Sequence, residues 1–279
     1  MNVKTVSYLN KDAAKILTNS LRETGFAVLT DHPISISLIN DAYKQWEEFF
    51  HSDIKNNYLF DKDKQDGFFP FGTENAKGYK EKDLKEFYHI YSWGKYPNEI
   101  NQSTNLLFKN IVELTSTILK WIQDETPSNI KSLFSMPLPK MIKNSENHLL
   151  RILHYPPLSG NEPFNAIRGA AHEDINLITL LVAGTQPGLQ VKDTSGTWHD
   201  VTCDIGAIAI NTGDMLNEAS GGYFPSTTHQ VINPNNQIKN ESRYSMPLFL
   251  HPKDEVILSK NYTAGQYLKE RIKEIGLRK

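Results

Sequence analysis

Two histidines and one aspartate stand in an order that could hold a metal ion. His172 and Asp174 are one residue apart and precede the apolar run 177–182, and His229 follows within 226–231. If the first pair lies on a strand, both side chains point to the same side, because side chains alternate along a strand. Two imidazoles and one carboxylate on one face suit a non-haem ferrous ion that keeps open coordination positions.

A second group of residues could bind a carboxylate. Arg243 and Ser245 are also two apart, so a strand would present the guanidinium and the hydroxyl on one face. The planar donor fork of Arg fits a carboxylate, and the Ser hydroxyl adds a hydrogen bond. Tyr155, at the end of an earlier expected strand, could supply a third donor. A keto acid held beside ferrous iron would make this site an iron oxygenase.

Each of these features has an ordinary explanation when it is taken alone. The chain has nine histidines, most of which we expect at the surface or hydrogen-bonded in the core, and a His-x-Asp step is a weak motif. Zinc accepts the same ligands, but a zinc hydrolase gives no role to Arg243 and Ser245, which favours iron. A non-catalytic binding module with a structural metal would not need all three ligands.

Composition narrows the class of protein. The chain has 279 residues with 39% hydrophobic and 22% charged residues, which is typical of a globular protein with a large core. A formal net charge of -2 without a basic stripe argues against a nucleic-acid partner. Cys203 is the only cysteine, so a reducing compartment is expected. With neither a signal-like apolar run nor a membrane-length stretch, we expect a cytoplasmic protein with a small-molecule substrate.

The first part of the chain, residues 1–140, is predicted to be mostly helical. Apolar residues recur every three or four positions within 11–24, after Ser35 and within 103–124, which is typical of amphipathic helices. Ser35 is the expected N-cap of the second helix. Glycine and proline within 66–72 indicate a loop between the second and third helices.

The second part is predicted to be built from strands. Short apolar runs alternate with turn residues, which favours a double-sheet jelly roll over 147–255, followed by a closing helix over 263–276. The expected fold is therefore α+β and mainly β. It has a double-stranded β-helix core, a helical N-terminal layer and a C-terminal helix, in a single domain over 1–279. The predicted strands cover 149–155, 177–182, 188–191, 207–211, 229–232 and 245–250, with an earlier one over 26–29.

Several longer segments resemble the motifs of a known family when they are taken together. These segments are Gly25-Phe26-Ala27-Val28-Leu29, His32-Pro33-Ile34, Gly67-Phe68-Phe69-Pro70, Asp83-Leu84-Lys85-Glu86-Phe87, Leu150-Arg151, Tyr155-Pro156-Pro157, Asn211-Thr212-Gly213-Asp214-Met215-Leu216 and Ser226 to Val231. Over nearly its whole length the chain resembles the isopenicillin N synthase-like, plant-type 2-oxoglutarate- and Fe(II)-dependent dioxygenases.

The resemblance implies an activity and assigns roles to residues. His172, Asp174 and His229 would be the iron ligands, and Arg243, Ser245 and Tyr155 would bind the distal carboxylate of 2-oxoglutarate. With Fe(II), and with 2-oxoglutarate and dioxygen as cosubstrates, the implied reaction couples oxidative decarboxylation to hydroxylation or desaturation of a small molecule. A same-family oxidase that needs no keto acid is the alternative. Many plant-type members carry Asn where this chain has Leu153, which affects contacts to the keto end of the cosubstrate.

The substrate pocket is less clearly marked. Small-molecule sites usually have apolar and aromatic walls with few polar groups. Phe68, Phe69, Phe224 and Phe249 are candidates for such walls, although aromatic residues are as often simply core residues. Arg168, just before His172, is a candidate partner for an anionic substrate, although most arginines are exposed.

Overall fold

Two β-sheets and a set of helices make up the computed structural model, which describes residues 1–75, 78–235 and 237–274. The larger sheet contains β1 (Lys4–Ser7), β2 (Phe26–Thr30), β10 (Ile208–Thr212), β7 (Ile178–Val182), β12 (Arg243–Leu250), β5 (Leu149–Tyr155), β4 (Glu86–Ile90) and β3 (Gly67–Phe69), in that spatial order. The smaller sheet contains β6 (Gly169–His172), β11 (His229–Val231), β8 (Leu189–Lys192) and β9 (Trp198–Asp200), again in spatial order. The mixed helix and sheet architecture expected from the sequence is therefore confirmed.

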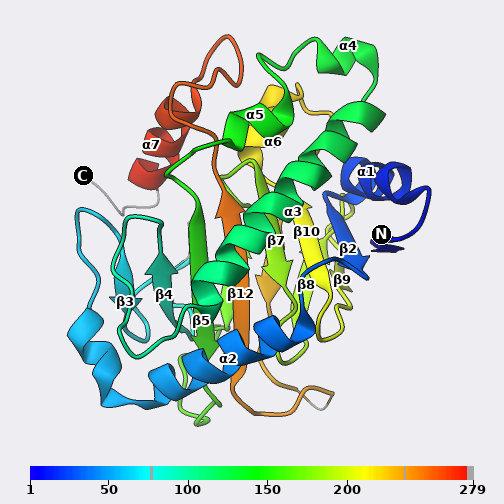
Figure 1. The fold of residues 1–279 in the computed structure, drawn as a ribbon. Helices are drawn as coiled ribbons and strands as arrows, with labels where there is room; N and C mark the ends of the chain where they lie inside the picture. The colour runs from blue at the N-terminus through cyan, green and yellow to red at the C-terminus, as the bar shows by residue number, and fades with distance from the viewer. Residues whose placement is uncertain (76–77, 236, 275–279) are drawn as a thin grey trace.

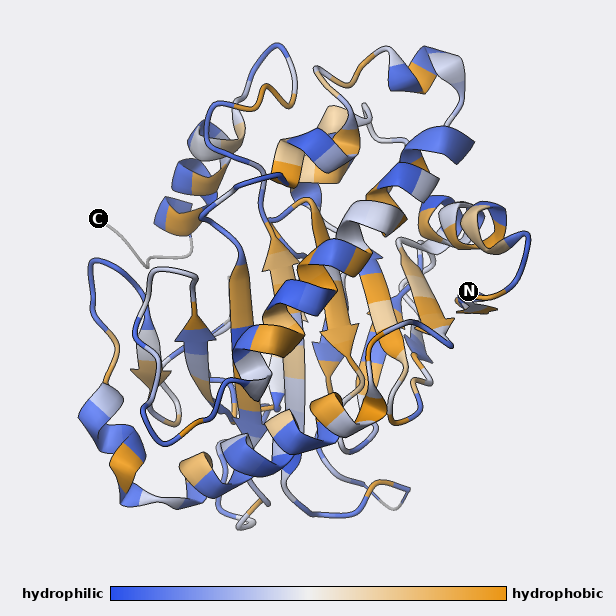
Figure 2. Ribbon diagram, in the orientation of Figure 1, coloured by the Kyte–Doolittle hydropathy of each residue, from blue (hydrophilic) through white to orange (hydrophobic). Residues whose placement is uncertain are grey.

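Helices cover one face of the larger sheet (Figure 1). The helices of the structure are α1 (Ala13–Thr24), α2 (Ile36–His51), the 3-10 helix η1 (Asp53–Tyr58), α3 (Ser103–Glu125), α4 (Ser128–Lys131), α5 (Leu138–Ile142), α6 (Asp214–Ala219) and α7 (Ala264–Glu274). Of these, α3 crosses the face of the sheet and α2 runs along one end of its strands, whereas α4 and α7 lie beyond the opposite end (Figure 1). Figure 2 shows that the central strands beneath α3 are predominantly hydrophobic. Trp46 of α2 and Ile118 of α3 are fully buried in the core that joins this helical layer to the sheet. Of the helices in the described residues, none combines the length and the hydropathy that crossing a bilayer requires.

The helices lie close to where the sequence predicts them. α1 and α3 begin and end within two residues of the predicted 11–24 and 103–124, and α2 begins directly after Ser35, as predicted. Ser35 is the N-cap residue of α2, but its side chain does not accept a hydrogen bond from a backbone N–H of the first turn. Its Oγ instead lies 2.7 Å from the Oγ of Ser37. The closing helix α7 lies within the predicted 263–276, of which positions 275 and 276 fall outside the described residues.

Two predictions about local structure are wrong. The segment 66–72 is not entirely loop, because Gly67–Phe69 forms β3 and pairs with β4 at the edge of the larger sheet. Gly67 has a φ of 101°, which explains the glycine at the start of that strand. Asp174 is not on a strand, because β6 ends at His172 and the chain then turns towards β7. Strand alternation therefore does not explain why Asp174 points to the histidines.

Candidate metal centre

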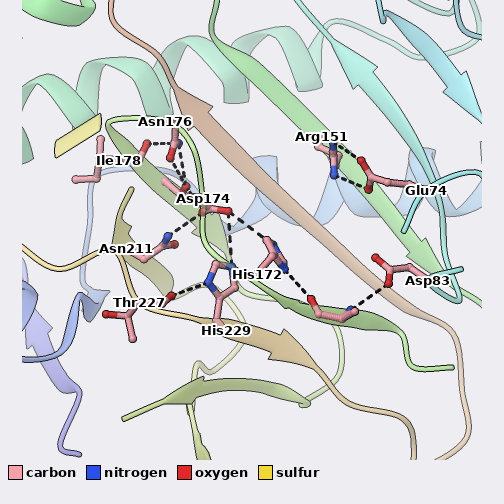
Figure 3. A network of polar contacts seen from close by, with 12 residues as sticks. Glu74, Asp83, Arg151, His172, Asp174, Asn176, Ile178, Asn211, Thr227 and His229 are labelled. Atoms are coloured by element: carbon pink, nitrogen blue, oxygen red, sulfur yellow. Dashed lines mark hydrogen bonds and ion pairs between the residues drawn. The ribbon is translucent and has the colours of Figure 1, made fainter. Parts of the chain in front are cut away.

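His172 and His229 face each other across neighbouring strands of the smaller sheet. They are register partners between β6 and β11, and their ring centroids lie 4.4 Å apart. Oδ1 of Asp174 lies 3.7 Å from Nε2 of each histidine. One ligand atom from each of the three residues lies within 4.8 Å of the others (Figure 3). Within residues 1–75, 78–235 and 237–274 no other His, Cys, Asp or Glu trio is arranged in this way.

The hydrogen bonds of the two imidazoles leave one nitrogen of each available. Nδ1 of His172 donates to the carbonyl oxygen of Ala170 at 2.8 Å, and Nδ1 of His229 donates to that of Thr227 at 3.1 Å. A carbonyl only accepts, so Nδ1 carries the proton and Nε2 presents a lone pair. Burial is the main cause that lowers the pKa of His172 to about 4, so its ring is neutral at neutral pH. Both rings are therefore prepared as metal ligands.

Asp174 is oriented by two residues of the larger sheet. Its Oδ2 accepts hydrogen bonds from Thr179 Oγ1 of β7 at 2.6 Å and from Asn211 Nδ2 of β10 at 2.8 Å. Burial alone would raise the pKa of this carboxyl, but the nearby histidines and the two hydrogen bonds lower it. The carboxylate is thus ionised, and Oδ1 remains free to face Nε2 of both histidines. Asn211 thus supports the site by orienting Asp174 and is not itself a candidate ligand.

A buried network of charges continues from the strand that carries His172. Oδ1 of Asp83 accepts a hydrogen bond from the backbone N–H of Ala170 at 3.1 Å (Figure 3), and its Oδ2 lies 2.7 Å from Lys85 Nζ. Lys85 Nζ also lies 2.9 Å from a Glu74 carboxylate oxygen. Ala170 in turn accepts from His172, so this network fixes the backbone that orients one candidate ligand.

The predicted carboxylate-binding residues also come together. The register pairs Arg243 with Tyr155 and Ser245 with Leu153, so all four share one face of the larger sheet. Nη1 of Arg243 donates to Ser245 Oγ at 3.2 Å, and its guanidinium carbon lies 5.2 Å from the centre of the Tyr155 ring. A Cβ on Gly184 would lie 2.8 Å from Arg243 Nη2, so a larger residue at this position would clash with the guanidinium.

The four candidate aromatic residues divide into two pairs. Phe69 belongs to a small cluster with Tyr155 and Leu153, and half-buried Phe249 is the register partner of Thr179. Both therefore lie on the sheet face that carries the candidate site. Phe68 and Phe224 instead lie in the main core.

The expectation that Phe68 and Phe224 line the mouth of the pocket is therefore wrong. Phe68 alternates with Phe69 along β3, so it faces the helical layer, where its ring packs against Phe49 and Phe50. Phe224 is 0% exposed and its ring contacts that of Tyr223.

The sequence did not identify Arg151 as a site residue, although it lies on the same strand as Leu153 and Tyr155. It pairs in register with His89 on the same sheet face as Tyr155, and its guanidinium lies 4.6 Å from the Phe87 ring centre and 5.6 Å from that of Phe249. A cavity of about 220 Å³ borders Phe69, Phe87 and His89. The spacing of Arg151 from Leu153 and Tyr155 is the signal that could have identified it, since all three alternate onto one face.

Comparison with known proteins identifies the family. Residues 146–252 match the model of the 2OG-Fe(II) oxygenase superfamily, and residues 6–111 match that of the non-haem dioxygenase in morphine synthesis N-terminal region. This chain belongs to the 2OG-Fe(II) oxygenase superfamily. The matched residues span the three candidate metal ligands and the candidate carboxylate site.

Relatives support the same conclusion. A crystal structure of a candidate oxygenase from Shewanella oneidensis is 50% identical, with 100% of both chains covered and a TM-score of 0.90. A candidate 2OG-Fe(II) oxygenase family protein from Caulobacter crescentus is 30% identical, with 98% of this chain and 99% of that chain covered and a TM-score of 0.81. A 2-oxoglutarate-dependent dioxygenase from Didymella fabae is 26% identical in an alignment of 263 positions that covers 81% of this chain and 75% of the relative.

This 2OG-Fe(II) oxygenase is therefore an oxidoreductase that uses Fe(II), 2-oxoglutarate and dioxygen, as the sequence predicted. The donor set fits ferrous iron, since two imidazole nitrogens and one carboxylate oxygen converge, which is the ligand set of non-haem iron sites with open coordination positions. The predictions of family, cofactors and reaction class are confirmed.

Proposed function

We propose that His172 Nε2, His229 Nε2 and Asp174 Oδ1 bind the Fe(II) ion. The convergence of these three atoms within 4.8 Å carries the proposal. It is supported by the hydrogen bonds that fix each ligand, because residues behind a metal's ligands set their tautomer and orientation.

Arg243, Ser245 and Tyr155 are the proposed binding site for the distal carboxylate of 2-oxoglutarate. Arg243 is 2% exposed, and no carboxylate of the described residues lies within ion-pair distance of it. A buried guanidinium without a counter-charge is costly, which favours an anionic ligand at this position. Leu153 is the register partner of Ser245, so an apolar side chain borders the cosubstrate.

The bound iron and 2-oxoglutarate supply the oxidising chemistry, with succinate and carbon dioxide as products beside the oxidised substrate. The protein's part is to hold both cosubstrate ends, to exclude water and to position the target C–H bond. The hydrogen bonds to Asp174, His172 and His229 keep these three side chains oriented toward the ion. Hydroxylation and desaturation differ in how the substrate is placed, and we propose one of these two outcomes.

The two sheets are proposed to form the double-stranded β-helix of a single dioxygenase domain. Asp174, between β6 and β7, bonds to the larger sheet while it faces the histidines of the smaller one, which supports an arrangement with the site between the sheets. β1 and β2, from the N-terminal region, join the same sheet as β12, and one hydrophobic core includes residues from both regions.

The primary substrate is proposed to be a small molecule that contacts Phe69, Phe249 and Arg151. Apolar and aromatic walls with a few fixed polar groups are typical of small-molecule sites, and Arg151 is held in place by its ion pair with Glu74, with Nη1 3.1 Å from Oε2 (Figure 3). A Neurospora crassa protein of the same fold has been solved in complex with alpha-KG and thymine, which supports a small ligand in this fold. The adjoining cavity of about 220 Å³ is large enough for only a small molecule.

Anaerobic titration tests the proposal. Adding Fe(II) and then 2-oxoglutarate to the protein should produce a weak visible charge-transfer band, which Asp174→Ala protein should lack. A screen of small molecules should then find compounds that stimulate succinate release. A band that persists in the Asp174→Ala variant would refute the ligand assignment, and product formation without any need for 2-oxoglutarate would refute the cosubstrate role.

A further inference from the structure

The guanidinium of Arg168 is buried beneath the start of β12. Its residue is 0% exposed, and Nη2 donates to the backbone oxygen of Glu241 at 2.6 Å. The backbone N–H of Arg168 donates to Asn233 Oδ1 at 2.9 Å. Glu241 and Asn233 both lie between β11 and β12, and Glu241 is two residues before Arg243. Arg168 is therefore fixed next to the proposed carboxylate site.

Two donor atoms of this guanidinium have no partner. Nε and Nη1 of Arg168 are buried without a hydrogen bond, and no carboxylate of the described residues is within ion-pair distance of its nitrogens. A buried donor left unsatisfied costs about 1–3 kcal/mol, and more when the group is charged. Most buried arginines are paired. The free donors thus indicate a ligand that accepts hydrogen bonds and carries negative charge.

Arg243 follows two residues after Glu241, which accepts the hydrogen bond from Arg168, and it has no acidic partner among the described residues either. Its Nε donates to the backbone oxygens of Gln186 and Pro187, and its Nη1 to Ser245 Oγ, all of which are neutral acceptors. Burial, and next the positive charge of Arg243, lower the pKa of Arg168 to about 10, while Tyr155 raises it. Arginine keeps its proton in proteins, so an anion between the two guanidinium groups would offset their repulsion.

We propose that Arg168 and Arg243 together bind the distal carboxylate of 2-oxoglutarate, with Arg168 as its second guanidinium ligand. This inference rests on the proposed function, which assigns that carboxylate to Arg243. The surroundings of Arg168 favour the cosubstrate over the primary substrate. Its hydrogen bond goes to the residue two before Arg243, whereas the proposed substrate wall is formed by Phe69, Phe249 and Arg151.

A ligand that lacks only the distal carboxylate isolates this contact. Binding of 2-oxoglutarate and of 2-oxopentanoate, which has a methyl group in its place, is measured by anaerobic calorimetry on the Fe(II)-loaded protein. Arg168→Met should raise the Kd for 2-oxoglutarate about 10- to 100-fold, the loss expected for a charge-assisted hydrogen bond. The Kd of the variant for 2-oxopentanoate should stay within about threefold of the wild-type value. This ligand has no distal carboxylate, so Arg168 makes no contact with it even in the wild type.

The controls separate the possible failures. Arg22→Met removes an exposed guanidinium paired with Glu23 and should leave both Kd values unchanged. An unchanged 2-oxoglutarate Kd in Arg168→Met, or an equal loss for both keto acids, overturns the role of Arg168. Failure of the wild-type protein to bind 2-oxoglutarate would instead overturn the proposed function itself.

Thermal stability distinguishes a ligand from a structural residue. Because ligand-free protein contains two unneutralised guanidinium groups, Arg168→Met should have a Tm equal to or above that of the wild type. 2-Oxoglutarate should then raise the Tm of the wild type more than that of the variant. A lower Tm without ligand and an equal rise with it would overturn the proposal. If Arg168→Met does not fold, Arg168→Lys keeps the charge but loses the planar fork, and it should show an intermediate loss of affinity.

Discussion

Asn211 donates a hydrogen bond of 2.8 Å to the Oδ2 of Asp174, from a strand of the larger sheet to a loop that leaves the smaller one. This bond, with that from Thr179, leaves only Oδ1 facing Nε2 of both histidines. A carboxylate on a loop would otherwise be free to rotate. The relationship explains how a residue beyond the end of its strand is nevertheless aligned with two residues on strands.

Replacing Asn211 by Ala should weaken metal binding without abolishing it. Residues that orient metal ligands typically contribute 10–100-fold to affinity or activity, so we expect the Kd for Fe(II) to rise by about that factor. Competition with a chelator under argon measures the change. An unchanged Kd would show that Thr179 alone orients the carboxylate.

Replacing Asp174 by Ala should eliminate Fe(II) binding and succinate formation, because only two imidazoles remain. Glu173→Gln is the matched control, since Glu173 is adjacent but accepts a hydrogen bond from Thr228 Oγ1 instead of facing the histidines. The control should retain iron-dependent turnover. Robust turnover by the purified Asp174→Ala protein would contradict the assignment.

Replacing Arg243 by Ala should mainly weaken the binding of 2-oxoglutarate. Loss of one member of a buried, hydrogen-bonded charge pair costs about 2–5 kcal/mol, so the Kd should rise by at least about 30-fold. Calorimetry with 2-oxoglutarate checks the value. An affinity equal to that of the wild type would place the distal carboxylate elsewhere.

Replacing Gly184 by Ala should weaken 2-oxoglutarate binding less than the loss of Arg243 does. The added Cβ would lie 2.8 Å from Nη2 of Arg243, so the guanidinium must shift from its present position. We expect a rise in the Kd for 2-oxoglutarate with little change in the Kd for Fe(II). Equal losses for both ligands would indicate a general distortion of the site.

His148 should make the protein less stable in acid. Burial lowers its pKa to about 4 from an ordinary value of 6.5. Between these pH values the unfolded chain binds a proton that the folded chain does not, so the free energy of unfolding falls as the pH falls. His148→Gln, which can still donate to the Ile142 oxygen, should reduce this slope by up to about 1.4 kcal/mol per pH unit. Urea unfolding at pH 7 and pH 5 measures it, and identical slopes would refute the prediction.

The sequence predicted the amphipathic helices and the buried strands because their periodicity is local. It predicted the metal trio because three side chains of the right type were already in a known order. The larger error concerned Asp174, whose direction depends on hydrogen bonds from Thr179 and Asn211 and so on contacts between two sheets. Periodicity cannot report such contacts, which only the folded chain creates.

The aromatic residues show the same limit. Phe68 and Phe69 are neighbours with the same chemistry, yet one packs under α2 and the other lies with Tyr155. Which of them faces inward depends on the register of β3 with β4, and β3 itself was predicted as loop. Arg168 was predicted as a partner for an anionic substrate. Its complete burial next to the start of β12 depends on how distant segments pack, which the sequence pattern does not report.

Phe26, in the second strand of the chain, packs edge-on against the ring of His229 with centroids 5.4 Å apart. Strand β2 in the N-terminal region thus contacts His229, a proposed iron ligand that lies about 200 residues later in the sequence. Chimeras that exchange the N-terminal third between related oxygenases would consequently alter the wall behind the iron, and recombination of such enzymes should keep this strand with its native catalytic half.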